Sequence, residues 1–231
     1  MHHQLNALDD VTTERSTLHS SMSTMLASID DLAGAQREAE IGLELARENQ
    51  NPTSLALGLF ATAWSSALDD PEVALAAVDE SIALTRAGAV DGAFGAALCQ
   101  AASLRARLGN AKLALELLRE GIAYSHEVGD NSNLANAVNR GAGITGRLGY
   151  HEISAVLAGL METVPFDIPI NVQFLSHERA DHYEVQVQVR SALGDAAYEA
   201  AAARGAKMAD EEIVQFILAE IDRMLAELDD A

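Results

Sequence analysis

A repeat with a period of about 39 to 40 residues is the feature that most constrains the fold of this chain. The segment 107–115 (RLGNAKLAL) aligns with the segment 147–155 (RLGYHEISA) at an offset of 40 residues, and both begin with Arg-Leu-Gly. The segments 68–75 and 29–35 continue the same frame toward the N-terminus. Four units therefore share one frame, and such units stack because none can bury its apolar face alone.

Small and branched apolar residues recur at steps of three and four within each unit, which is the period of a helix. In two successive units these positions are Ala74, Val78, Ser81, Ile82 and Thr85, and Ala114, Leu118, Gly121, Ile122 and Ser125. Each unit is predicted to be a pair of helices. Segments such as 55–68 and 95–108 form the first helix of a pair.

Capping residues indicate where these helices begin and end. Asp70-Pro71 and Asn51-Pro52 each combine a side chain that accepts from free amides with a proline at the first helical position. Gly88 and Gly129 lie where second helices should end. The signals predict second helices that begin just after Asp31, Asp70 and Asn110.

Composition and charge exclude several classes of protein. The chain is 49% hydrophobic and only 4% aromatic, which favours closely packed helices over a β-sandwich or barrel. One cysteine permits no internal disulfide, and no signal segment or long apolar run is visible, so we expect a soluble, cytoplasmic protein. A net charge of −20 repels phosphates and anionic lipids, which argues against nucleic-acid or membrane binding.

The small positions of the four units resemble the tetratricopeptide repeat. They are Ala35, Ala74, Ala114 and Ser154, followed seven residues later by Gly42, Ser81 and Gly121. The period here is longer than that of the usual repeat, which is about 34 residues, and the aromatic residue near the start of the usual repeat is mostly absent. The resemblance covers residues 11–160 and implies an α-α superhelix, in which the first helices line the concave surface.

The segment 177–218 resembles the terminal region of large actinobacterial regulators. It contains Leu193-Gly194, Tyr198 amid alanines, Gly205, and the acidic pair Glu211-Glu212. The relatives with this pattern include LuxR-type transcriptional regulators and ATPase-linked nucleotide cyclases. This resemblance implies that the chain is, or derives from, the C-terminal helical-repeat part of such a regulator.

These observations predict an all-α fold: a tetratricopeptide-like helical-repeat superhelix with a C-terminal helical cap. Residues 1–162 hold four two-helix repeats, 163–176 form a connector with two of the four prolines, and 177–231 form capping helices. The capping helices are expected over 178–193, 194–204 and 210–228.

Recurring polar residues on the first helices are the candidate binding site. Cations favour helix C-termini, and that alone could explain the arginines. The alternative is a polar groove for an acidic peptide or a small anion. The residues of this predicted groove are Arg107, Arg147, Asn136, Asn139, Arg140 and Ser103.

No motif indicates catalysis, a cofactor or a metal. A phosphate-binding loop is absent, and Gly141-x-Gly143-x-x-Gly146, with Asp167 beyond it, lacks the preceding strand that a dinucleotide site needs. His177 and His182 are five positions apart, whereas a zincin helix needs a spacing of four. Cys99, and Trp64 with Phe60 beside it, are interpreted as core residues.

The sequence therefore predicts a non-catalytic module that binds a protein, a peptide or a small anionic effector, as the sensor or scaffold segment of a transcriptional regulator. Two alternatives stay open at this point. One is the C-terminal regulatory part of a nucleotide-cyclase or ATPase enzyme. The other is an oligomerisation domain, for which the apolar face of the last helix would make a homodimer.

Overall fold

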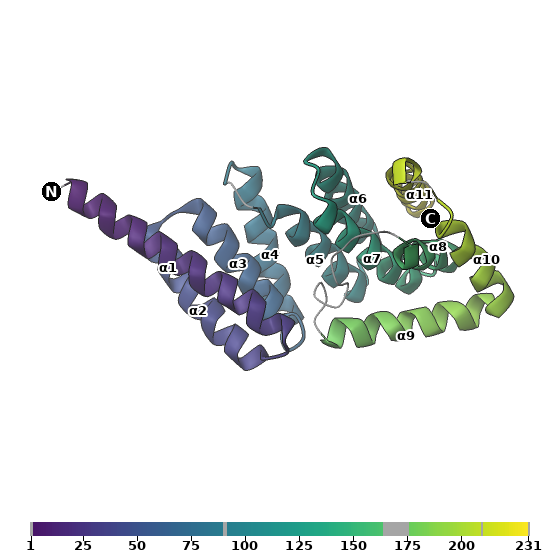
Figure 1. Ribbon diagram of the computed structural model, residues 1–231, viewed down its shortest axis with the longest axis horizontal. Coiled ribbons are helices and arrows are strands. Elements are labelled where there is room, and N and C mark those ends of the chain that lie inside the picture. The colour runs from purple at the N-terminus through teal and green to yellow at the C-terminus, as the bar shows by residue number, and fades with distance from the viewer. Residues whose placement is uncertain (1, 90–91, 164–175, 209, 231) are drawn as a thin grey trace. The chain divides into compact units, whose positions relative to one another are not determined.

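The computed structural model describes residues 2–89, 92–163, 176–208 and 210–230, without the side chains of 2–10, 162–163, 176–178 and 210–211. These residues form eleven α-helices and no β-strand (Figure 1), which confirms the predicted all-helical class. The helices are α1 (His2–Ser28), α2 (Leu32–Asn49), α3 (Pro52–Ser66), α4 (Pro71–Arg86), α5 (Phe94–Arg107), α6 (Ala111–Glu127), α7 (Asn131–Arg147), α8 (His151–Thr163), α9 (Ser176–Leu193), α10 (Asp195–Gly205) and α11 (Asp210–Asp229).

The chain divides into two compact units, Met1–Ala97 and Leu98–Ala231, and the boundary lies within α5. In unit 1, α1 packs along α2 and α3, and α3 packs against α4. In unit 2, α7 packs against α6 and α8. The stacking of all four helix pairs into one superhelix stays a prediction, as do the predicted boundaries at residues 162 and 176.

The starts of the second helices recur with the period of the sequence. They are Leu32, Pro71, Ala111 and His151, and each lies at the same point of the repeat frame to within one position. Before the first three, the side chains of Asp31, Asp70 and Asn110 accept from the backbone N–H three residues on. These bonds satisfy amides that a helix leaves free in its first turn, so the sequence fixes the helix starts locally.

The other predicted end signals are also confirmed. The Asn51 side chain accepts from the backbone N–H groups of Thr53 and Ser54 before α3. Gly88 and Gly129 adopt φ of +109° and +71° just after α4 and α6. A residue with a β-carbon is strained at such angles, so glycine ends these helices at low energy.

The small residues that recur in the repeat frame lie where paired helices are in contact. Ala35, Ala74, Ala114 and Ser154 are fully buried. In the second helix α4, the Ser81 Oγ donates to the Ala56 carbonyl of α3 at 2.8 Å. A β-carbon at Gly42 of α2 would lie 2.7 Å from the Ser20 Oγ of α1. Small residues of the repeat frame therefore lie at the contacts between α1 and α2 and between α3 and α4.

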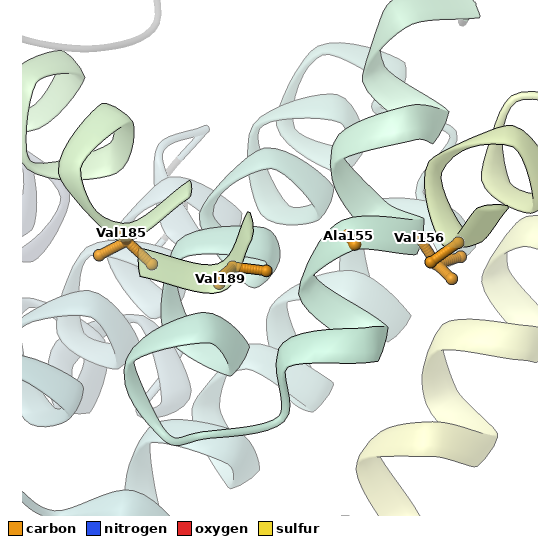
Figure 2. Close-up of a cluster of buried hydrophobic side chains, with 5 residues drawn as sticks. Ala155, Val156, Val185 and Val189 are labelled. Atoms are coloured by element: carbon orange, nitrogen blue, oxygen red, sulfur yellow. The ribbon is translucent and has the colours of Figure 1, made fainter. Parts of the chain in front are cut away.

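Three further helices complete unit 2, at the positions that the sequence predicts to within two residues. Helix α9 packs against α7 and α8, and α10 against α8. Figure 2 shows Ala155 of α8 beside Val185 and Val189 of α9, with Val156 on the side of α8 that faces away from α9. Helix α11 packs against α6, with Ile217, Ile221 and Met224 buried. The predicted connector with Pro165 and Pro169 lies outside the described residues.

Candidate functional site

A group of polar side chains is buried where α5 meets α7 in unit 2. This polar cluster consists of Gln100 and Ser103 of α5 and Asn136, Asn139 and Arg140 of α7. Arg140 is only 4% exposed, and Gln100, Asn136 and Asn139 are buried as well. Charged residues are rarely buried in proteins unless they are paired or hydrogen-bonded. The hydrogen-bond partners of Arg140 therefore determine how its charge is accommodated.

Hydrogen bonds to Asn136 and Ser103 fix the Arg140 guanidinium. Its Nε donates to the Asn136 Oδ1 at 3.1 Å, one turn earlier on α7. Its Nη1 donates to the Ser103 Oγ of α5 at 3.2 Å. The Ser103 Oγ in turn donates to the Cys99 carbonyl at 3.1 Å, which leaves the serine oxygen oriented as an acceptor. The helical spacing of 136 and 140 provides the first bond, whereas the second depends on how α5 and α7 pack.

Most of the side chains around Arg140 are buried. Burial raises the pKa of the Cys99 thiol to about 12, although the nearby Arg140 charge acts to lower it. The Gln100 Oε1 is buried and accepts no hydrogen bond within the described part of the chain. Electrostatic interactions are strong in such a setting, and a buried acceptor without a donor is unfavourable.

Helix α9 brings a histidine toward the same side of α7. A β-carbon at Gly143, one turn after Arg140, would lie 3.3 Å from the His182 Nδ1. Burial lowers the pKa of His182, the neighbouring Asp181 carboxylate acts to raise it, and Arg140 acts to lower it further. Sequence reasoning considered His182 as part of a solvated polar face or of a metal site, and it missed both His182 and Gln100 as neighbours of the predicted groove residues.

The structure brings together only part of the predicted groove. Hydrogen bonds join Ser103, Asn136 and Arg140, and Asn139 is buried on the same helix. Arg107 is exposed in the last turn of α5. Arg147 donates to both carboxylate oxygens of Asp181, at 2.6 and 2.7 Å. Arg107 and Arg147 therefore do not share the buried setting of Arg140.

The remaining motifs have structural roles. Gly141, Gly143 and Gly146 lie inside α7, and a β-carbon at Gly146 would lie 2.6 Å from a methyl group of Val185. These glycines let α7 pack closely against its neighbouring helices. Cys99 is fully buried, and the rings of Phe60 and Trp64 are in contact, with centroids 5.6 Å apart. Asp167 lies outside the described residues.

The structure describes only some of the side chains in the segment 177–182, so it tests a metal site there only in part. The side chains of His177 and Glu178 lie outside the described set. Among the side chains that are described, no group of three or more His, Cys, Asp or Glu residues is arranged to hold a metal ion.

The polar cluster contains one group suited to anion recognition, the Arg140 guanidinium. A guanidinium forms planar, paired hydrogen bonds with carboxylates and phosphates. The Ser103 hydroxyl donates to a backbone carbonyl and not to a base, and the Cys99 thiol stays protonated at neutral pH. Neither side chain is therefore set up as a nucleophile.

Searches of protein-family models, of curated proteins and of solved structures each find no match to this chain. Among the helices that the structure describes, none is both long and apolar enough to cross a membrane.

Proposed function

We propose that this chain is a non-catalytic binding module that recognises an acidic peptide or a small anionic effector at the polar cluster. The observation that supports this function best is the buried Arg140 guanidinium, which Asn136 and Ser103 hold in a fixed orientation. A guanidinium oriented in advance loses little conformational freedom when a carboxylate binds it, which favours affinity and specificity.

The rest of the chain supports a localised anion site. The net charge of −20 repels anions from most of the surface, so nonspecific binding of an acidic ligand is weak. A ligand that also carries an N–H or O–H group could donate to the Gln100 Oε1. A peptide with an acidic side chain has both groups, because its backbone amide is a donor.

Thermal unfolding with a panel of acidic peptides and small carboxylates tests this function. A ligand at about 100 times its dissociation constant stabilises the folded state by about 2.7 kcal/mol, and calorimetry then gives its affinity. Arg140→Lys keeps the charge but loses the planar fork, and we expect it to weaken binding at least tenfold. The matched control is Arg204→Lys, at an exposed arginine of α10.

Two outcomes would contradict the proposal. One is that no anionic ligand stabilises the protein, and the other is that Arg140→Lys binds a ligand as tightly as the parent chain does. Because Arg140 is buried, its replacement could destabilise the fold. Ser103→Ala provides a second variant, which removes one hydrogen bond to the guanidinium at a partly exposed position and should weaken binding severalfold.

The wider role rests on the sequence resemblance of 177–218 to the terminal region of large regulators. In this proposal the module is the sensor or scaffold segment of a cytoplasmic, signal-dependent transcriptional regulator. A bound effector would act by stabilising one arrangement of the helices over another, which requires different affinities for the two. Hydrogen exchange of α5 and α7 with and without the effector tests this, and equal exchange in both would contradict it.

A further inference from the structure

Helix α1 buries small polar side chains and exposes large apolar ones, which is the reverse of an ordinary surface helix. The face against α2 and α3 carries Ser16, Ser20, Ser23 and Ala27, all fully buried. The Ser16 Oγ donates to the Gly42 carbonyl of α2 at 2.8 Å, so small polar groups form the internal contact. Figure 1 shows α1, in purple, lying along α2 and α3 within unit 1.

The apolar residues of α1 and of the turn after it lie on the opposite face. Leu18, Met22, Met25 and Ile29, which we call the α1 seam, are between 39% and 73% exposed. Each follows a buried small residue by two positions, and two residues correspond to about 200° around a helix. Val11, seven residues before Leu18, extends the line and is also exposed. Large apolar side chains gathered on one exposed face mark an interaction surface.

The spacing of the α1 seam is that of a coiled coil. Steps of four, three and four residues from Leu18 to Ile29 repeat the a and d positions of a heptad. A single amphipathic helix that packs on a globular core has a wider apolar stripe. In α1 the face that packs on the core carries the buried serines, so the seam is not needed for that contact. The seam therefore matches another helix better than it matches an irregular surface.

We propose that the α1 seam binds the α1 seam of a second copy of this chain, with the two helices antiparallel. In that pairing Leu18 lies opposite Ile29 of the second copy, and Met22 lies opposite its Met25. Two-fold symmetry repeats both pairs, so all eight side chains face apolar partners. The seam is thus complementary to itself.

Charges at the two ends of the seam favour the same antiparallel pairing. Arg15 lies on the seam face, one turn before Leu18, and its side chain is exposed. Asp30 and Asp31 directly follow Ile29 at the other end and are exposed as well. Antiparallel pairing brings Arg15 of each copy to the acidic pair of the other, whereas parallel pairing brings the two arginines together. Charge complementarity of this kind selects orientation more than it adds affinity.

The size of the contact indicates a weak dimer. Two helices meeting along four seam residues each should bury roughly 1,000 Å², which is near the lower limit for a specific interface. We therefore expect a dissociation constant on the order of 10 µM, so the chain is monomeric when dilute and dimeric when concentrated.

Sedimentation equilibrium of the full chain at about 1 to 300 µM tests the proposal. The mass should rise from 24.5 kDa toward twice that value. Met22→Glu and Met25→Lys should each weaken dimerisation at least tenfold, because each places a charge opposite an apolar side chain. The matched control is Val187→Glu, at a half-exposed valine in the middle of α9, and it should dimerise like the parent.

Mixing Met22→Glu with Met25→Lys tests the register. The mixture should form a heterodimer more tightly than either variant dimerises alone. In that heterodimer the introduced carboxylate meets the introduced ammonium group, while the unchanged Met25 meets the unchanged Met22. A parallel pairing gives no such recovery. A constant monomer mass over the whole range, a dimer unaffected by either seam variant, or a mixture without recovery would each overturn the proposal.

The salt dependence checks the charged ends, and ligand binding separates this inference from the proposed function. Arg15→Glu should weaken the dimer about two- to fivefold at low salt, with the difference shrinking at about 1 M salt. A change that grows with salt would contradict the pairing of Arg15 with Asp30 and Asp31. The polar cluster lies in unit 2, so seam variants should leave its ligand affinity unchanged, and either proposal can fail without the other.

Discussion

Gly159 of α8 and Ala202 of α10 lie in backbone contact: a β-carbon at position 159 would be 2.0 Å from the Ala202 carbonyl oxygen. The contact is reciprocal, since a β-carbon at Gly205 of α10 would be 2.0 Å from the Val156 carbonyl oxygen of α8. Two glycines thus allow two helices to approach until their backbones touch. This contact helps to hold α10, and the hydrophobic cluster around Val156 and Ala201 forms beside it.

Gly159→Ala should destabilise the protein by about 2 kcal/mol, and Gly205→Ala should do the same, because α8 and α10 must move apart to admit the methyl group. Alanine gains up to about 1 kcal/mol from helix propensity, which is less than such overpacking costs. Urea denaturation followed by circular dichroism measures the effect. Gly92→Ala is the control, because no atom of the described residues lies within 4 Å of a β-carbon there. Equal stability of Gly159→Ala and Gly92→Ala would contradict the close contact.

Two serines of α1 should respond to alanine in opposite directions. Ser16→Ala removes the hydrogen bond to the Gly42 carbonyl and should cost about 1 kcal/mol of unfolding free energy. The Ser23 Oγ is buried and has no hydrogen-bond partner in the described structure, so Ser23→Ala should gain about 0.5 kcal/mol. The two variants are matched in chemistry and burial. Thermal unfolding of both compares them directly, and a loss of stability in Ser23→Ala would show that its hydroxyl has a partner.

Alkaline pH should weaken the fold through Cys99. Its folded pKa, about 12, lies above the ordinary thiol value of 9.0, so the folded state keeps the proton while the unfolded state releases it. The stability from this group is complete below the unfolded pKa and is lost as the pH rises toward the folded pKa. Between pH 8 and 10 the parent should lose about 1 kcal/mol more than Cys99→Ala does. Parallel slopes of stability against pH for the two proteins would refute this.

Mild acid should weaken unit 2 through His182. Burial lowers the pKa of this histidine in the folded protein, so the unfolded state binds a proton first as the pH falls. The stability from this group is therefore present above the unfolded pKa, about 6.5, and is lost as the pH falls through the folded value. His182→Gln should flatten the slope of unfolding free energy between pH 7 and 5. His126→Gln, at an exposed position of α6, serves as the control and should keep the parent slope.

The candidate site could be predicted only in part. Asn136 and Arg140 are four positions apart on a helix, so the sequence alone places their side chains together. Nothing local tells Arg140 from Arg107 or Arg147, which all lie on first helices. Arg147 forms an ion pair with Asp181, which is distant in sequence, and this pairing depends on how α9 packs against α7. Gln100 carries no motif, and the sequence singles out His182 only by its spacing from His177, so only the structure shows that both lie near the groove residues.

The sequence by itself determined the helical class, the repeat frame and the helix starts at Leu32, Pro71 and Ala111. It could do so because capping bonds, such as those of Asp31 and Asp70, join groups within three residues of each other. Tertiary structure decided which arginine is buried, where α11 packs, and that α1 turns serines inward and methionines outward. These outcomes depend on which helix faces meet, and that is settled by packing among residues far apart in the chain.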